Sequence, residues 1–167
     1  MALRHISVEG DEILRKKCRE VGEVTDRIRM ILGDMRETML AANGVGLAAP
    51  QVGLMRRMFV AMPDPEDPEQ IFYMVDPEIY ETEGVQSGEE GCLSVPGLVG
   101  NVDRPQRIKI RAKGFFGEPQ DLEFEDFAAR VMCHEYDHLD GILYTDKATD
   151  VHEPVYEEPD EEEEETE

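Results

Sequence analysis

The chain has 167 residues, the size of one ordinary domain with or without a tail, and its formal net charge at pH 7 is -22. A surface this negative repels phosphate backbones and anionic lipid head groups, which excludes a general binder of DNA or of membrane surfaces. Residues 157–167 hold nine acids and no basic residue, so the other 156 residues, with 17 basic and 30 acidic side chains, carry -13.

The cysteine pattern and the start of the chain concern the cellular compartment. Cys18, Cys92 and Cys133 have no spacing typical of a disulfide framework, which fits a reducing compartment. The first residues lack the apolar core of a signal peptide, and no stretch approaches the roughly 20 apolar residues of a membrane span. We therefore expect a cytoplasmic protein that has no contact with a membrane.

The first half of the chain predicts two helices followed by two strands. A short helix is expected over residues 11–18, and residues 26–42 repeat apolar side chains with the helical period. Residues 58–61 and 71–75 are apolar runs typical of strands. The proline-rich residues 63–68 between them fit no regular element.

The second half predicts a hairpin followed by a helix. Residues 107–113 and 121–125 alternate polar and apolar side chains, and the Gly- and Pro-containing residues 114–119 join them. Residues 126–139 return to the helical period, and after about residue 150 the periodic pattern stops.

These elements together indicate an α+β fold, with mixed or antiparallel sheets around a central helix. Residues 1–150 are expected to form the folded domain. Residues 151–167 have too few apolar side chains to offset the entropy lost on ordering, so we expect an acidic, disordered tail.

The last expected helix carries the sequence His134-Glu-Tyr-Asp-His138. Residues four apart lie one above the other on a helix, so both imidazoles reach a single metal ion. Glu135 lies about 100° around the helix from His134, where it reaches a water on that ion without binding the ion. A chance meeting of two histidines is the alternative, but the pair shares its stripe with Phe127 and Val131, which places it toward the core.

An open catalytic metal site needs a third protein ligand. Zinc proteases with this motif take it from a third His or a later Glu, but here Tyr144 stands at the His position and only Glu153 and the acidic tail follow. The other candidate donor is Cys92, in the segment Glu89-Glu-Gly-Cys-Leu-Ser-Val-Pro-Gly97, where Gly and Pro predict a tight bend. A small buried hydrophobic residue is the alternative for a lone Cys.

A third segment, Gly44-Val-Gly-Leu-Ala-Ala-Pro-Gln-Val-Gly53, sets small residues around one amide, that of Gln51. Small residues let a ligand or another backbone approach closely. A glycine-rich turn from helix to strand is the alternative. The segment is not a phosphate loop, because the Gly-Lys-Ser/Thr ending is absent.

The three segments together resemble the motifs of a known family. Gly44-Val-Gly-Leu-Ala-Ala-Pro-Gln51, Glu90-Gly-Cys-Leu-Ser94 and His134-Glu-Tyr-Asp-His-Leu-Asp-Gly141 match, in order and spacing, those of bacterial peptide deformylase. The resemblance runs from about Leu3 to Asp146. It implies a metallohydrolase that removes the N-formyl group from the initiator methionine of new polypeptides and releases formate.

The resemblance implies a metal centre. The ion would be held by Cys92, His134 and His138; in the family it is ferrous iron in the cell, and zinc, nickel or cobalt commonly replace it. The donors themselves indicate only that a borderline-soft divalent ion suits the site. Such an ion makes a water molecule nucleophilic, and Glu135 would accept the proton of that water and return it to the leaving amine.

The resemblance also implies residues that contact the substrate. The side-chain amide of Gln51 and the backbone N–H of Leu93 would stabilise the negative charge that develops on the formyl oxygen. Gly46 and Gly91 would lie along the substrate backbone, where a side chain would intrude. Val131 is the main candidate for the wall of the methionine pocket.

Two further expectations concern the surroundings of the motifs. Arg104 is a candidate partner for Glu90 that would brace the cysteine loop, and a surface ion pair with another acid is the alternative. Known family members often end in a long basic helix that docks on the ribosome, whereas this chain ends in acids. We therefore expect transient ribosome contact at most, not by such a helix, and a monomer.

Two rival functions stay open on the sequence alone. One is a metalloprotease, which would cleave internal, unformylated peptide bonds. The other is a non-enzymatic module that binds a metal or a partner and carries an acidic interaction tail.

Overall fold

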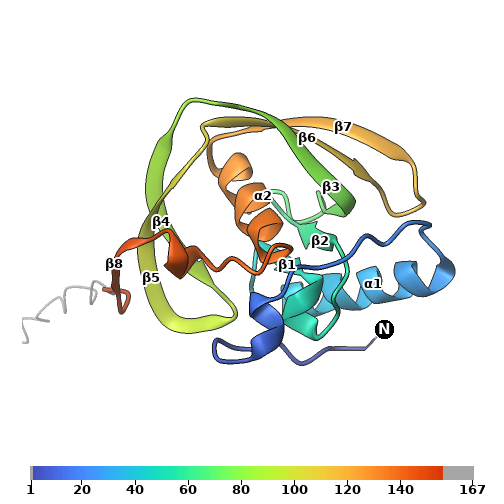
Figure 1. Cartoon of the computed structure of the whole chain (residues 1–167), viewed down its shortest axis with the longest axis horizontal. Helices are drawn as coiled ribbons and strands as arrows, with labels where there is room; N and C mark the ends of the chain where they lie inside the picture. The colour runs from blue at the N-terminus through green and yellow to red at the C-terminus, as the bar shows by residue number, and fades with distance from the viewer. Residues whose placement is uncertain (1, 156–167) are drawn as a thin grey trace, which may run out of the picture.

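Figure 1 shows the computed structural model of the chain, which describes residues 2–155. These residues form two α-helices, α1 (Asp26–Ala41) and α2 (Asp126–His138), and the 3-10 turns Glu12–Arg15, Ala49–Val52 and Tyr144–Asp146. The strands are β1 (Gly46–Ala48), β2 (Met58–Ala61), β3 (Phe72–Glu83), β4 (Gln86–Cys92), β5 (Val95–Arg104), β6 (Arg107–Lys113), β7 (Pro119–Glu125) and β8 (Thr149–His152).

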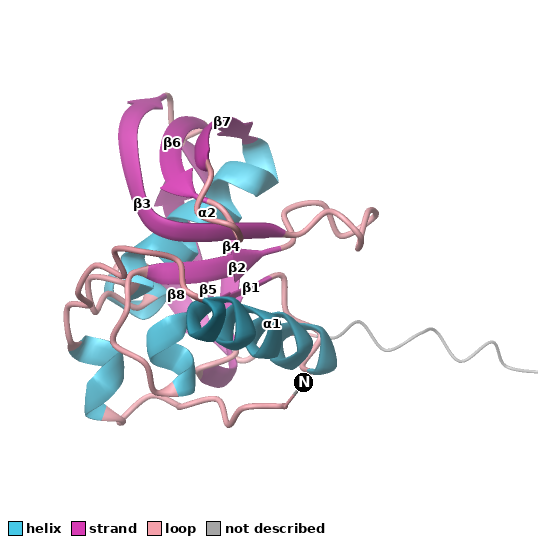
Figure 2. Ribbon diagram, turned by 90° about the vertical axis from the view of Figure 1, so that its right-hand side faces the viewer, coloured by secondary structure: helices cyan, strands magenta, loops and turns pink. Residues whose placement is uncertain are grey.

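The strands form two antiparallel sheets on either side of α2. The first sheet has the order β1-β2-β3-β6-β7, and the second has the order β4-β5-β8. Helix α2 packs between them, and α1 lies along β1 and β2 (Figures 1 and 2). The expectation of an α+β fold with sheets around a central helix is confirmed.

Most of the expected elements are present. Helix α1 begins after Thr25, whose hydroxyl accepts a hydrogen bond from the N–H of Ile28, and it ends before Asn43, at φ 56°. Strand β2 and helix α2 lie where the sequence predicts them, and β6 pairs with β7 as the expected hairpin. The helix expected over 11–18 is wrong, because only the 3-10 turn Glu12–Arg15 forms there.

The strand expected over 71–75 continues to Glu83. Asp76 and Pro77 lie within the longer strand, although proline usually interrupts a regular ladder. The structure accommodates them with a register shift between Val75 and Glu78, where Asp76 adopts φ 48°. A β-bulge therefore lets one strand pair with β2 at its start and β6 further along.

Strands β1, β4, β5 and β8 were not expected. Strand β1 has only three residues and lies in the small-residue segment 44–53. The sequences of β4, β5 and β8 contain several glycines and charged residues, and β-propensity there is low. Strand β8 extends two residues past the expected domain end at 150, because Val99 and Asn101 of β5 pair with His152 and Thr149. The expected disordered tail otherwise falls largely on residues 156–167, which lie outside the described part of the chain.

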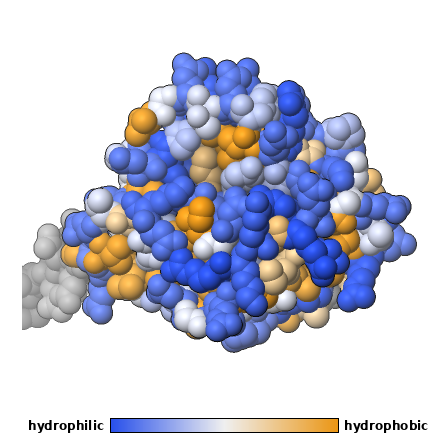
Figure 3. Space-filling view, in the orientation of Figure 1, coloured by the Kyte–Doolittle hydropathy of each residue, from blue (hydrophilic) through white to orange (hydrophobic). Residues whose placement is uncertain are grey.

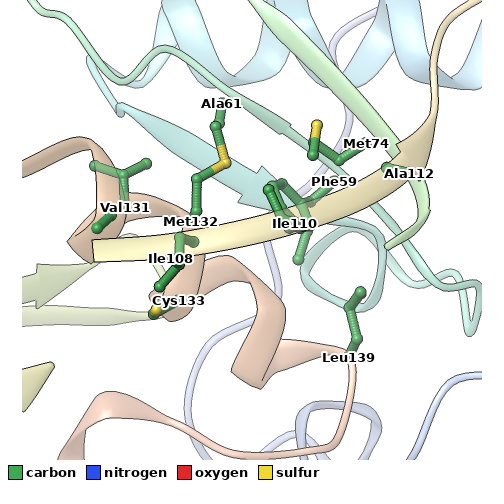
Figure 4. Close-up of a cluster of buried hydrophobic side chains, with 12 residues drawn as sticks. Phe59, Ala61, Met74, Ile108, Ile110, Ala112, Val131, Met132, Cys133 and Leu139 are labelled. Atoms are coloured by element: carbon green, nitrogen blue, oxygen red, sulfur yellow. The ribbon is translucent and has the colours of Figure 1, made fainter. Parts of the chain in front are cut away.

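The largest group of buried apolar side chains lies between α2 and the five-stranded sheet. Figure 4 shows Val131, Met132 and Cys133 of α2 close to Phe59 and Ile108 from the strands, and all five are buried. Polar residues cover most of the face shown in Figure 3, with apolar residues in small separate groups. No helix among residues 2–155 is long and apolar enough to cross a membrane.

The helix stripe expected to face the core holds for three of its four members. Val131, His134 and His138 are buried, whereas Phe127 is 45% exposed. Phe127 lies in the first turn of α2, where its side chain borders a cavity.

Candidate active site

Two elements far apart in the sequence bring the three expected metal ligands together. His134 and His138 lie one turn apart on α2. Cys92 ends β4, and because it pairs with Val95, the connection to β5 is a two-residue turn of Leu93 and Ser94. This tight turn is the bend that the sequence predicts.

The three side chains form a compact donor set. Their ligand atoms all lie within 4.8 Å of one another, and the Cys92 sulfur is 3.4 Å from Nε2 of His138. Burial alone would lower the pKa of His134, but its contacts with Cys92 and Glu90 raise that pKa to about 10. The site therefore favours a positive charge at this point, and one thiolate with two imidazoles fits a borderline-soft divalent cation.

Glu90 orients the first histidine from behind. Its Oε1 is 2.8 Å from Nδ1 of His134, which leaves Nε2 to face the donor set. Arg104 donates to both Glu90 oxygens at 2.9 Å, so the expected brace is confirmed and both side chains are buried. Burial would raise the pKa of Glu90, but the hydrogen bonds from Arg104 and His134 lower it to about 2.

Glu135 is buried beside the donor set. Its Oε2 has no hydrogen-bond partner among residues 2–155, and burial raises its pKa to about 7. A Cβ atom added at Gly46 would lie 2.6 Å from Glu135 Oε1. The glycine is thus required by the carboxylate itself, in addition to any substrate that passes it.

Gln51 is held by both ends of its side chain. Its Oε1 accepts a hydrogen bond of 2.9 Å from the N–H of Ala48, and its Nε2 donates to the Ser94 hydroxyl at 3.0 Å. The same Nε2 is 3.6 Å from the Cys92 sulfur. An amide nitrogen carries two hydrogens, so one of them is directed toward the donor set.

A cavity of about 480 Å³ opens onto these groups. Eight of the nine expected site residues line it, and His138 lies behind them in the donor set. The eight are Gly46, Gln51, Gly91, Cys92, Leu93, Val131, His134 and Glu135. The cavity lies between β1 and β4, each of which is an edge strand of its sheet in the described part of the chain.

Three residues of the site are ones that the sequence did not lead us to expect there. Ser94 accepts the Gln51 hydrogen bond, and Arg130 lines the cavity and bonds to Glu90 at 2.7 Å. The buried Tyr144 stacks on His134, with ring centroids 6.0 Å apart. The position of Arg130, four residues before His134 on a helix, was the one signal that could have drawn attention to it.

Comparison with known proteins places this geometry in a family. The family described as polypeptide deformylase matches residues 3–153. The peptide deformylase of Agathobacter rectalis is 51% identical over 94% of this chain and 98% of its own length, and that of Clostridium botulinum is 49% identical over 89% and 99%. The crystal structure of peptide deformylase from Thermotoga maritima superposes with a TM-score of 0.85 at 37% identity, covering 89% of this chain and 99% of that one. The chain belongs to the peptide deformylase family, metal-dependent hydrolases that remove the N-formyl group from nascent polypeptides.

Proposed function

We propose that Cys92, His134 and His138 hold the catalytic metal ion and that this ion is Fe²⁺ in the cell, with Zn²⁺, Ni²⁺ or Co²⁺ as substitutes in purified protein. The observation that carries the ligand set is the convergence of a thiolate and two imidazoles within 4.8 Å. When bound, a divalent ion acts as a Lewis acid and makes a water molecule nucleophilic at neutral pH.

Glu135 is the general base and acid of the reaction. A carboxylate whose pKa is raised by burial to about 7 accepts a proton at neutral pH and returns it readily. Its unpartnered Oε2 is the atom for this transfer. The proton would go first from the attacking water to Glu135 and then to the amine that leaves as the new N-terminus.

Gln51 and Leu93 stabilise the charge that develops on the formyl oxygen. Nε2 of Gln51 is fixed by Ser94, so its orientation costs nothing during the reaction. The N–H of Leu93 belongs to the two-residue turn directly after Cys92. Losing one such donor costs on the order of 3 kcal/mol of transition-state stabilisation in other hydrolases.

The two edge strands that border the cavity suit an extended peptide. Gly46 of β1 and Gly91 of β4 offer backbone groups without side chains, and a strand edge pairs with an added segment. A Cβ at Gly91 would meet only ordinary contacts of 3.5 Å, so packing does not require this glycine and the space beside it is free for substrate. Val131, which is buried on the cavity wall, contacts the methionine side chain.

The remaining proposals concern the surroundings of the enzyme. We propose a cytoplasmic monomer that acts on formylated nascent chains and binds neither DNA nor membranes. The net charge of -22 supports the absence of binding to DNA and membranes, because it opposes approach to phosphate-rich surfaces. Contact with the ribosome is then transient and does not use a basic C-terminal helix.

The test is formate release from a formyl-methionine peptide by protein purified with iron in the absence of oxygen. We expect turnover by the wild-type protein, loss of turnover with retained metal in Glu135→Ala, and loss of metal in Cys92→Ala. Metal analysis of the anaerobic wild-type protein checks the identity of the ion. A metal-loaded protein that releases no formate, or that cleaves unformylated internal bonds instead, would contradict the proposal.

A further inference from the structure

Arg130 is a buried arginine inside α2 that bonds across to the second sheet. Its Nη1 atom lies 2.7 Å from Oε2 of Glu90, 2.9 Å from the carbonyl oxygen of Val102 and 3.2 Å from that of Gly88. Its side chain is only 7% exposed. The guanidinium is therefore shielded from water, and two backbone carbonyl groups and one carboxylate accept its hydrogen bonds in place of water.

The acceptors of Arg130 all belong to the hairpin that carries Cys92. Gly88 and Glu90 lie on β4 and Val102 lies on the paired strand β5, whereas Arg130 itself lies one turn before His134. The guanidinium therefore joins the helix that supplies two donors to the hairpin that supplies the third. It also contacts the carboxylate that orients His134.

Gly88 shows how closely the guanidinium is seated. A Cβ atom added at Gly88 would lie 2.9 Å from Nη2 of Arg130 and 3.1 Å from its Cζ. The glycine on β4 thus makes room for the arginine from α2.

Arg104 holds the same Glu90 from the other direction. It lies on β5 and its guanidinium is 2.6 Å from Asp137 of α2. Arg104 thus reaches from the hairpin to the helix, whereas Arg130 reaches from the helix to the hairpin. Arg130 additionally binds the backbone of both strands of the hairpin, so it ties α2 directly to the main chain of β4 and β5.

We propose that Arg130 is a positioning residue of the metal centre, which fixes the distance between the Cys92 sulfur and the two imidazoles and holds Glu90 against His134. The inference rests on the proposed ligand set of Cys92, His134 and His138. Partners outside the ligand set that orient it typically change metal affinity by about 10- to 100-fold when they are mutated. The loss of Arg130 should therefore weaken metal binding while the fold is kept.

The test compares Co²⁺ retention in three arginine variants. Arg130→Met keeps the apolar stem along the cavity wall and removes the guanidinium, and we expect Co²⁺ release to a chelator about 10- to 100-fold faster, with an altered thiolate-to-cobalt absorption band. Arg130→Lys restores one charge beside Glu90 without the forked contacts and should recover part of the loss. Arg57→Met is the matched control. The side chain of Arg57 is 14% exposed at the other end of α2 and bonds to Leu139 and Asp140, and among residues 2–155 it makes no hydrogen bond to the hairpin.

A second variant, Gly88→Ala, tests the same proposal if Arg130→Met does not fold. Gly88→Ala retains every charge and displaces the guanidinium, so it should also release Co²⁺ faster than wild type. Wild-type retention in both Arg130→Met and Gly88→Ala would overturn the inference, and so would an equal loss in Arg57→Met. A wild-type protein that holds no Co²⁺ would contradict the ligand set itself, which separates the two proposals.

Discussion

The carboxylate of Glu135 and the backbone of Gly46 share a space that has no room for a methyl group. A Cβ atom added at Gly46 would lie 2.6 Å from Oε1 of Glu135, which is closer than real Cβ atoms approach other heavy atoms. Gly91, across the cavity, has no such neighbour, since its Cβ would lie 3.5 Å from Leu98 and Val99. The two glycines of the cavity therefore serve different purposes, although the sequence assigns them the same one.

We predict that Gly46→Ala lowers kcat by displacing Glu135, with the metal content unchanged. Mispositioning a general base forfeits part of the about 10²- to 10⁴-fold that acid–base catalysis contributes. Gly91→Ala is the matched control, and its effect should fall on KM, because the methyl group occupies space beside the substrate. Steady-state kinetics of formate release with both variants decide the matter, and an unchanged kcat in Gly46→Ala would contradict the assigned cause.

The site could be predicted from sequence where it depends on local spacing. His134 and His138 are four residues apart on a helix with a clear period, and Cys92 lies in a short bent segment. Arg130 and Tyr144 could not be placed in this way. Their partners depend on which face of α2 meets the β4–β5 hairpin, and that packing has no local signal in the chain.

At the level of elements, the β4–β5 hairpin was the largest part of the fold that sequence patterns did not indicate, and the short strands β1 and β8 were the others. Its strands are stabilised by buried ion pairs to α2 and by a two-residue turn, so period-2 apolar alternation is weak. By contrast, α1, β6, β7 and α2 bury a regular stripe or face and were predicted within a residue or two. Regular amphipathic elements can thus be recognised locally, whereas this hairpin is defined by tertiary contacts.

The first residues are anchored to α1 by a carboxylate. Asp34 is 5% exposed and accepts hydrogen bonds of 3.0 Å from the N–H of Ala2 and from Nη2 of Arg4. The hydrogen bond from Ala2, with the contribution of Arg4, lowers the pKa of Asp34 below its usual value although burial opposes this. A carboxylate of this kind adds stability above its unfolded pKa of about 3.9, and the stability is lost as pH falls through the folded pKa.

We predict that Asp34→Asn is less stable than the wild-type protein at pH 7 and that the gap narrows as the pH falls below about 4. Urea unfolding of both proteins, measured side by side across that range, gives the difference in the free energy of unfolding. Asp26→Asn removes one acid from an exposed position at the start of the same helix and serves as the control. A gap independent of pH would indicate lost packing and contradict the role of the charge.

At the scale of the whole molecule, the site residues and the strongest run of acidic residues lie in different parts of the sequence. All expected site residues lie among residues 46–138, between the two sheets. The acidic run at residues 157–167 holds nine of the 39 acids. Strand β8 stands between these two parts: it is the last described strand and pairs with β5, the strand that completes the cysteine hairpin.

We therefore predict different outcomes for two truncations. A chain ending at residue 155 keeps β8 and every expected site residue, so it should release formate from short free peptides as the full chain does. A chain ending at residue 148 loses β8 and exposes Gly100, which lies close to Val151, so β5 loses its partner on one side. Its Tm and its metal retention should both fall.

Thermal unfolding, metal analysis and kinetics of formate release, measured on the full chain and on both truncated chains, check this prediction. Lost activity in the longer truncation product would show that residues 156–167 take part in the reaction, and an unchanged shorter product would show that β8 does not support the hairpin.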